Sequence, residues 1–75
     1  MDTHPPQLVQ TVEAILRYLD QHPDAADTLE GITRWWLPGD PPVDLSTVEA
    51  ALARLESQGL VHRHANVDRH ILFSR

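Results

Sequence analysis

Imidazole and guanidinium side chains gather near one end of the sequence. Residues 60–75 contain His62, His64 and His70 together with three arginines. Alternate side chains of a β-strand share a face, so His62 and His64 project together and could chelate a metal. His70 joins them if the hairpin register sets it opposite His64, and lies on the other face if Arg69 takes that place. With either register no carboxylate is well placed to complete the coordination shell, so the sequence predicts no metal site.

No arrangement typical of catalysis is visible. The chain has no cysteine, no glycine-rich phosphate loop, and no serine with an evident histidine and aspartate partner. Its paired carboxylates, Asp24 with Asp27 and Asp40 with Asp44, stand where turns and helix caps account for them. A chain of this size also has little room for a substrate cleft. We therefore expect neither an enzyme nor a bound cofactor, and no small-molecule substrate.

The composition is that of one small acidic domain. The 75 residues include six arginines, no lysine and eleven carboxylates, which gives a net charge of −5. So short a chain buries only about 60% of its potential surface, and a partner or a second copy would help its core. It lacks the run of about 20 apolar residues that a membrane helix needs, and the absence of cysteine fits a reducing compartment. We expect a single cytoplasmic domain over residues 1–75, with a disordered tail at 1–4.

The clearest predicted element is a helix that ends at Gly59, where a glycine favours the left-handed conformation of a helix stop. Ser46 and Glu49 have the spacing of a capping box at its start, and Asp44 is the competing cap. Spacings of i, i+3, i+4 and i+7 predict its buried stripe. This stripe consists of Val48, Ala51, Leu52 and Leu55. After Gly59, β-prone residues from Leu60, a break at 65–68 and a second run at 69–75 predict a hairpin.

Two shorter periodic stretches precede this helix. The first ends near Gln21, because the next residue precedes a proline. Its buried face is predicted to hold Leu8, Val12, Ile15, Leu16 and Leu19. The second has Thr28 as its cap, with Asp27 as the alternative, and a stripe of Leu29, Ile32 and Trp36. Gly31 within it suggests close approach of another backbone. Prolines between 38 and 42 then predict a stiff loop.

These elements together resemble a winged helix-turn-helix domain. The matching residues are Thr28 to Ile32, Ser46-Thr47-Val48, Leu52, Leu55, Gly59-Leu60-Val61 and Asp68 to Ile71. The resemblance implies a mainly α fold of three helices and a C-terminal two-stranded antiparallel wing. A short third strand before the second helix remains open. The chain departs from the family pattern in its long proline loop, because a helix-turn-helix joins its two helices by three or four residues.

The resemblance implies a DNA-binding transcription regulator that works as a dimer on double-stranded DNA. By likeness to the family, Ser46, Thr47 and Arg54 lie on the helix that enters the major groove, and Arg63 and Arg69 lie on the wing. The run Asp68-Arg69-His70 is similar to the wing of MarR-type regulators, with His70 where an arginine stands. Such a wing would hold phosphate better below about pH 6.5, where imidazole becomes cationic. The net charge of −5 is the physical difficulty.

The alternative is an acidic winged helix that contacts protein and binds no DNA. Trp35 lies off the predicted buried stripe, and Leu37 follows it at the edge of the proline loop. An exposed tryptophan beside an apolar residue is a typical interface anchor. Trp35 and Leu37, with Val43 as a further candidate, therefore form the expected interface for a protein partner or a second copy. In the opposing interpretation the loop folds back and buries them.

Overall fold

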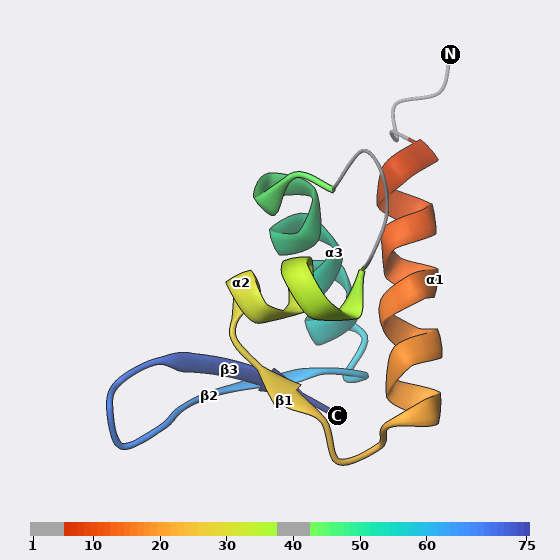
Figure 1. Cartoon of the computed structure of the whole chain (residues 1–75). Coiled ribbons are helices and arrows are strands. Elements are labelled where there is room, and N and C mark those ends of the chain that lie inside the picture. Colours follow the sequence, from red (N-terminus) through yellow and green to blue (C-terminus); the bar gives the residue numbers. More distant parts are fainter. Residues whose placement is uncertain (1–5, 38–42) are drawn as a thin grey trace.

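The computed structural model describes residues 6–37 and 43–75. The elements run in the order α1 (Pro6–Gln21), β1 (Ala26–Asp27), α2 (Leu29–Gly31), η1 (Ile32–Trp36), α3 (Leu45–Ser57), β2 (His62–Ala65) and β3 (Ile71–Ser74) (Figure 1). α2 continues directly into η1, so the described chain has three helical segments and a small antiparallel sheet. This confirms the predicted mainly helical class, and the layout is compatible with a winged helix. None of the described helices is long and apolar enough to cross a membrane.

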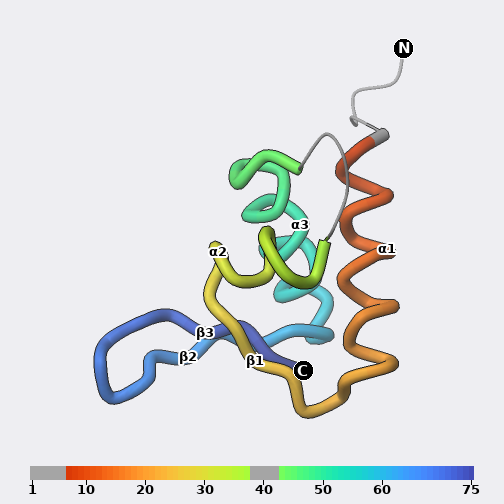
Figure 2. Tube along the Cα trace, viewed as in Figure 1, coloured from red at the N-terminus to blue at the C-terminus, as the bar shows by residue number. Residues whose placement is uncertain are grey.

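The sheet has three strands in the order β1-β3-β2, both pairs antiparallel. β1, just before the second helical segment, pairs with β3, so the sheet contains more than the two-stranded wing. The hairpin of β2 and β3 projects away from the helices, as both the ribbon and the tube show (Figures 1 and 2). Its strands begin at His62 and Ile71, two residues later than the predicted starts at Leu60 and Arg69.

The core lies where α1 and α3 pack together and the η1 segment and the sheet close one end. α1 contributes Ile15 and Leu19, while the segments after it contribute Val61 and Phe73. The predicted stripe of α3 is confirmed, since Val48, Ala51, Leu52 and Leu55 are all fully buried. Leu8, Val12 and Leu16 of α1 are half-buried against this core, as the period of 3.6 residues predicts.

The two ends of α3 differ in how well the sequence predicts them. The helix begins at Leu45 with Asp44, the competing candidate, as its N-cap residue. Ser46 is therefore the second residue of the helix and Glu49 the fifth, so the predicted capping box is wrong. At the other end Gly59 has φ of 74°, as predicted. Its N–H donates to the Glu56 carbonyl at 3.0 Å, and the Leu60 N–H donates to the Leu55 carbonyl at 2.9 Å. These two bonds form a Schellman motif, which satisfies carbonyls that the helix leaves unpaired.

The second helical segment changes its winding part-way. Thr28 caps it as predicted, because its hydroxyl accepts the Gly31 N–H at 3.1 Å. From Ile32 the segment is a π-helix, whose i→i+5 bonds place more residues in each turn. Leu37, five residues after Ile32, therefore returns to the buried face and is only 6% exposed.

Gly31 is also explained differently from the prediction. A Cβ on Gly31 would collide with the Asp27 carboxylate, so a side chain approaches here and not another backbone. That carboxylate accepts the Thr28 N–H at 2.8 Å, which holds it over the first turn of the helix. The predicted proline loop at 38–42 lies outside the described residues.

Candidate interaction surfaces

α3 displays the side chains expected to read DNA on a face with mixed charge. Ser46 and Arg54 are exposed and Thr47 is half-buried. Arg54 and Glu56 stand about 200° apart around the helix at 3.6 residues per turn. They therefore flank the exposed face of α3 on opposite sides.

Arg63 is held on the Glu56 side of α3. Its Nε donates to Glu56 Oε2 at 2.8 Å, and its guanidinium carbon lies 5.3 Å from the centre of the Phe73 ring. The register pairs Arg63 with Phe73, so both face the helices. The side chain is half-exposed, which makes this a weak ion pair. Even so, the carboxylate beside it lowers the positive charge that Arg63 offers to a phosphate.

Arg69 lies in the turn between β2 and β3. Its φ is 65°, a left-handed conformation that residues other than glycine seldom adopt. Asn66 organises this turn, because its side-chain oxygen accepts the N–H groups of Asp68 and His70 at 2.9 and 3.0 Å. Val67 at the tip is 98% exposed. Within residues 6–37 and 43–75, neither Arg69 nor Arg54 forms an ion pair.

The histidines follow neither of the two registers considered from sequence. His62 pairs with Ser74 and His64 with Leu72, so both histidines stand on the face opposite Arg63. His70 precedes β3, and its carbonyl accepts the Asn66 N–H at 3.0 Å. The described part of the chain holds no group of three His, Cys, Asp or Glu side chains arranged for a metal.

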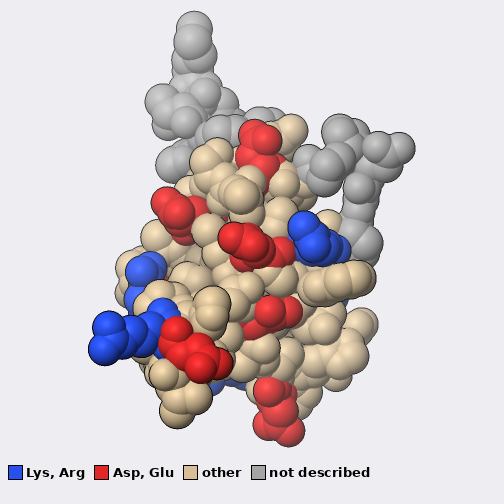
Figure 3. All heavy atoms as spheres, turned by 60° about the vertical axis from the view of Figure 1, so that its left-hand side comes forward, with Lys and Arg blue, Asp and Glu red and all other residues tan. Residues whose placement is uncertain are grey.

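Acidic and basic side chains both occur on the face of the molecule drawn in Figure 3. In the view of Figure 3, acidic side chains lie down the middle of the face and basic ones lie toward its margins. Arg75, at the end of β3, donates to the Leu19 carbonyl at 3.2 Å and lies 3.5 Å from Asp20. Two of the three arginines after Gly59, Arg63 and Arg75, are therefore next to carboxylates.

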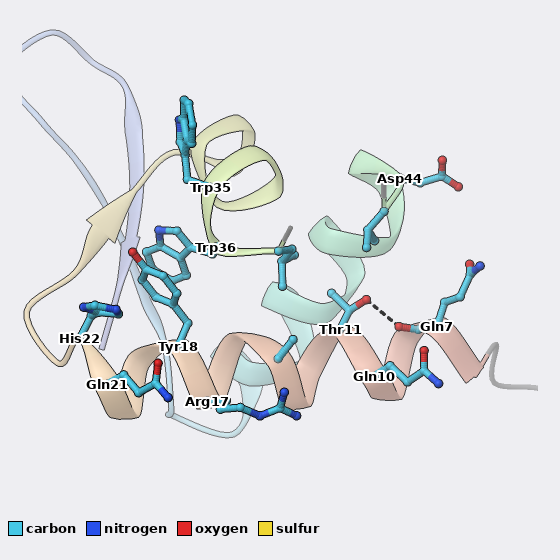
Figure 4. Close-up of a pocket in the computed structure, with 13 residues that line it drawn as sticks. Gln7, Gln10, Thr11, Arg17, Tyr18, Gln21, His22, Trp35, Trp36 and Asp44 are labelled. Carbon is cyan, nitrogen blue, oxygen red and sulfur yellow. Dashed lines mark hydrogen bonds between the residues drawn. The ribbon is translucent and has the colours of Figure 1, made fainter. Parts of the chain in front are cut away.

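A groove of about 870 Å³ lies between α1 and the η1 segment. Its α1 wall is formed by residues spaced three or four apart on one face of the helix. These are Gln7, Gln10, Thr11, Ala14, Arg17, Tyr18, Gln21 and His22. The other lining residues are Trp35, Trp36 and Leu37, from η1 and the residue after it, and Val43 and Asp44, which precede α3 (Figure 4).

An aromatic stack lies at the end of the groove near His22. The rings of Tyr18 and Trp36 are stacked with their centres 4.6 Å apart and an interplanar angle of 11°. The His22 ring is 4.4 Å from Tyr18 on the same helix. Figure 4 shows Trp36 turned toward Tyr18, whereas Trp35 points away from α1. The two rings are in direct contact, so α1 and η1 touch at this end and Trp36 is only 6% exposed.

Trp35 and Leu37 have opposite environments. Trp35 is 69% exposed, while Leu37 is buried in the core at the groove wall. Val43 is half-buried. Of the two expected anchors, Trp35 alone offers a large apolar surface. Leu37 is therefore not an exposed anchor, and the loop expected to cover both side chains lies outside the described residues.

The comparisons with known proteins give no relative. No family model matches the chain, and neither the curated proteins nor the solved structures searched contain a match. The surfaces described above are therefore interpreted from their own chemistry.

Sequence reasoning missed the groove along α1. Of the polar residues of α1, Gln10 and Arg17 line the groove, whereas Glu13 and Asp20 do not. One signal was present in the sequence. A second, more polar face of α1 also repeats at helical spacing beside the apolar stripe. It consists of Gln7, Gln10, Ala14, Arg17 and Gln21.

Proposed function

We propose that this chain is a winged-helix module whose function is to contact another protein. The order of the elements supports the winged-helix assignment: a helix, a short strand, two further helical segments, and a hairpin directly after a glycine stop. The third strand that the hairpin acquires from β1 is consistent with that layout. Fold alone does not determine function, so the partner class is argued from the surface.

The exposure of Trp35 is the observation that carries the proposal. The Trp35 side chain is 69% exposed and lies beside a groove that contains stacked aromatic rings. Leaving so much apolar surface in water costs free energy. Tryptophan is also the residue most enriched among the anchors of protein interfaces. An overall charge of −5 is compatible with a protein partner and opposes a phosphate backbone.

Affinity capture with matched variants tests this function. The wild-type chain and a Trp35→Ala variant are immobilised, and bound proteins are compared quantitatively by mass spectrometry. We expect one or more partners to be retained by the wild type and reduced at least tenfold with Trp35→Ala, because an interface anchor contributes about 2 kcal/mol or more. Val67→Ala is the control, since Val67 is apolar and exposed at the hairpin tip, well outside the groove lining.

Two further results complete that test. Analytical ultracentrifugation of both proteins shows whether the partner is a second copy, in which case Trp35→Ala lowers the mass at high concentration. Equal capture and equal mass for wild type and Trp35→Ala would contradict a role for Trp35 in binding.

DNA binding is retained as the second candidate because two arginines are available for it. Arg54 on α3 and Arg69 in the hairpin turn are exposed, and neither has an ion-pair partner among the described residues. The proposed contacts are Ser46, Thr47 and Arg54 to the major groove and Arg63 and Arg69 to the backbone.

A titration with duplex DNA at 50 and 200 mM salt tests this candidate. If the protein regulates transcription, it should bind the duplex at the lower salt concentration. Its affinity for DNA should then fall steeply between about 50 and 200 mM salt, because binding releases counterions from the phosphates. Arg69→Ala should reduce the salt slope by about one, whereas Arg54→Ala should cost about 1–3 kcal/mol and relax the specificity at the base that Arg54 contacts. If no binding is detected at 50 mM salt, the DNA candidate is rejected and the protein-contact proposal is unaffected.

A further inference from the structure

One side of β2 is unpaired. β2 comes last in the strand order β1-β3-β2, so among the described strands it pairs with β3 alone. All four of its residues are exposed, and none is a lysine or a proline, two residues that commonly protect a sheet edge. Its arginine, Arg63, turns toward the helices and is bonded to Glu56. The edge of β2 is therefore open to pairing with another strand.

The hydrogen bonds of the hairpin show which backbone groups point to this open edge. The Asn66 N–H donates across the hairpin to the His70 carbonyl at 3.0 Å. In an antiparallel pair, the N–H and C=O groups of successive residues point to alternate sides of the strand. The even-numbered residues of β2 therefore turn their backbone groups toward β3, as Asn66 does, whereas Arg63 and Ala65 turn theirs outward. A strand added at this edge must bond to Arg63 and Ala65.

A second copy of β2, added antiparallel, brings histidines of the two chains together. With Arg63 of both copies on the two-fold axis, each His62 lies opposite His64 of the other copy. These are non-hydrogen-bonded pairs, whose Cα atoms lie about 4.5 Å apart. All four histidines share the sheet face opposite Arg63, because side chains two residues apart project alike. In a register shifted by two residues, with Arg63 opposite Ala65, only the two His64 side chains would face each other.

Four imidazoles in this arrangement match the coordination of zinc. Zinc is bound tetrahedrally and takes histidine nitrogen as a ligand. Within the described residues of a single chain, no third His, Cys, Asp or Glu side chain joins His62 and His64. The second copy supplies the two further ligands that complete the shell.

The charges of the two chains favour a cation at this position. Each copy has a net charge of −5, so two copies repel each other until a positive ion lies between them. On the opposite face of the sheet the two Arg63 side chains meet, and like charges directly opposite are destabilising. Each of them has its own Glu56 at 2.8 Å, which offsets that repulsion.

We propose that β2 pairs with β2 of a second copy, and that His62 and His64 of both copies bind one zinc ion between them. This inference goes beyond the proposed protein contact, because it uses neither Trp35 nor the groove.

Analytical ultracentrifugation of the full chain during a zinc titration tests the proposal. At about pH 7.5, where imidazole is largely neutral, we expect the mass to double as one zinc ion binds per two chains. Removal of the metal with EDTA should restore the original mass. Magnesium, which prefers oxygen ligands, should have no effect.

Histidine variants locate the ligands. His62→Ala and His64→Ala each remove two of the four ligands of the dimer. Each should weaken zinc binding about a hundredfold or more, because even a residue that only supports a metal ligand contributes up to about that factor. His22→Ala, an exposed histidine on α1, is the matched control and should leave zinc binding unchanged.

A backbone variant tests the strand pairing separately from the ligands. The Ala65 N–H points outward, so Ala65→Pro breaks no bond to β3 but cannot donate to a second copy. Ala65→Pro should abolish the zinc-dependent dimer, whereas Ala65→Thr should retain it. In the wild type, zinc should slow amide exchange at Arg63 and Ala65 about tenfold or more, because both N–H groups become bonded.

Several results would overturn the proposal. These are binding of one zinc ion per chain without a change in mass, equal loss with His22→Ala, unchanged amide exchange at Arg63, or a zinc-dependent dimer that persists in Ala65→Pro. Trp35→Ala should keep the zinc-dependent dimer, so a failure of the protein-contact function and a failure of this proposal are distinguished.

Discussion

At the scale of single residues, Asp27 and Gly31 illustrate how two neighbours fix one another. The Asp27 carboxylate occupies the space where a Cβ of residue 31 would lie, and it accepts the Thr28 N–H at 2.8 Å. Glycine at position 31 costs about 1 kcal/mol of helix propensity relative to alanine. The Asp27 carboxylate can therefore occupy this space only because residue 31 is a glycine, which lowers the stability of the helix.

This pairing predicts a change of sign in a double-mutant cycle. Gly31→Ala in the wild type should destabilise the fold by about 1–3 kcal/mol, because the carboxylate must be displaced. In an Asp27→Ala background, the same substitution should stabilise it by up to about 1 kcal/mol, since the clash is gone and the propensity gain remains. Urea denaturation of the four proteins measures both values.

The cycle has a clear failing result. If Gly31→Ala has the same effect in both backgrounds, the carboxylate does not determine the identity of residue 31. Asp27→Ala alone serves as the reference for the lost bond to Thr28.

At the scale of elements, η1 decides which apolar side chains are available for binding. Its π winding brings Leu37 under the same face as Ile32, while Trp35 remains outside. An α-helical continuation would place Leu37 about 140° from Ile32 and expose it. π-helical turns occur frequently at functional sites, and here the turn separates a core residue from an exposed aromatic residue.

This separation predicts opposite effects of two substitutions. Leu37→Ala should destabilise the fold by roughly 2–5 kcal/mol, as expected for a buried leucine. Trp35→Ala should change stability by less than about 0.5 kcal/mol, because it removes exposed surface. Thermal or urea unfolding distinguishes them. A large loss with Trp35→Ala would mean that Trp35 packs in the core, and the capture experiment would then need a different variant.

The same element shows where sequence reasoning succeeds and where it stops. Periodicity located α1, α3 and their buried stripes, because each stripe repeats over several turns and one misplaced residue does not change it. It could not place Leu37, since the residue types from Ile32 to Trp36 contain no sign that the helix widens. The predicted start of α3 was wrong for a related reason. Asp44 and Ser46 are both residue types that favour the N-cap position, so the sequence alone does not choose between them.

The candidate surfaces were predicted less completely than the fold. Exposure of Arg54, Arg63 and Arg69 follows from their type, but the ion pair of Arg63 with Glu56 depends on the hairpin register. That register was not predictable from composition. The Asn66 side chain organises the turn between the two strands, and the strands start later than the β-prone residues suggest. The groove forms where two elements lie side by side, and a local sequence pattern does not predict how elements are placed relative to one another.

At the scale of the whole molecule, the described residues form a rigid helical part and a projecting hairpin. Val48, Leu52 and Leu55 of α3 are fully buried, whereas all four residues of β2 are exposed. Stability should therefore be distributed unevenly, since local opening is easiest where little apolar surface is buried.

Hydrogen exchange monitored by NMR checks this distribution. We expect the amides between Val48 and Leu55 to exchange at the rate of global unfolding. The amides of residues 66–70 should exchange faster by roughly two orders of magnitude or more. Uniform protection across both regions would show that the hairpin is coupled to the core more tightly than its burial indicates.

The position of β3 has a consequence for how the chain folds. β3 follows the other two strands in the sequence yet lies between them in the sheet. Ala26 pairs with Ser74, 48 residues later (74 − 26), so on the ribosome β1 emerges long before its partner exists. Pairing over such a separation raises the contact order and slows closure. A nascent chain that stops short of Ile71 has no ladder at either edge, so the sheet is acquired as a whole when its middle strand is made.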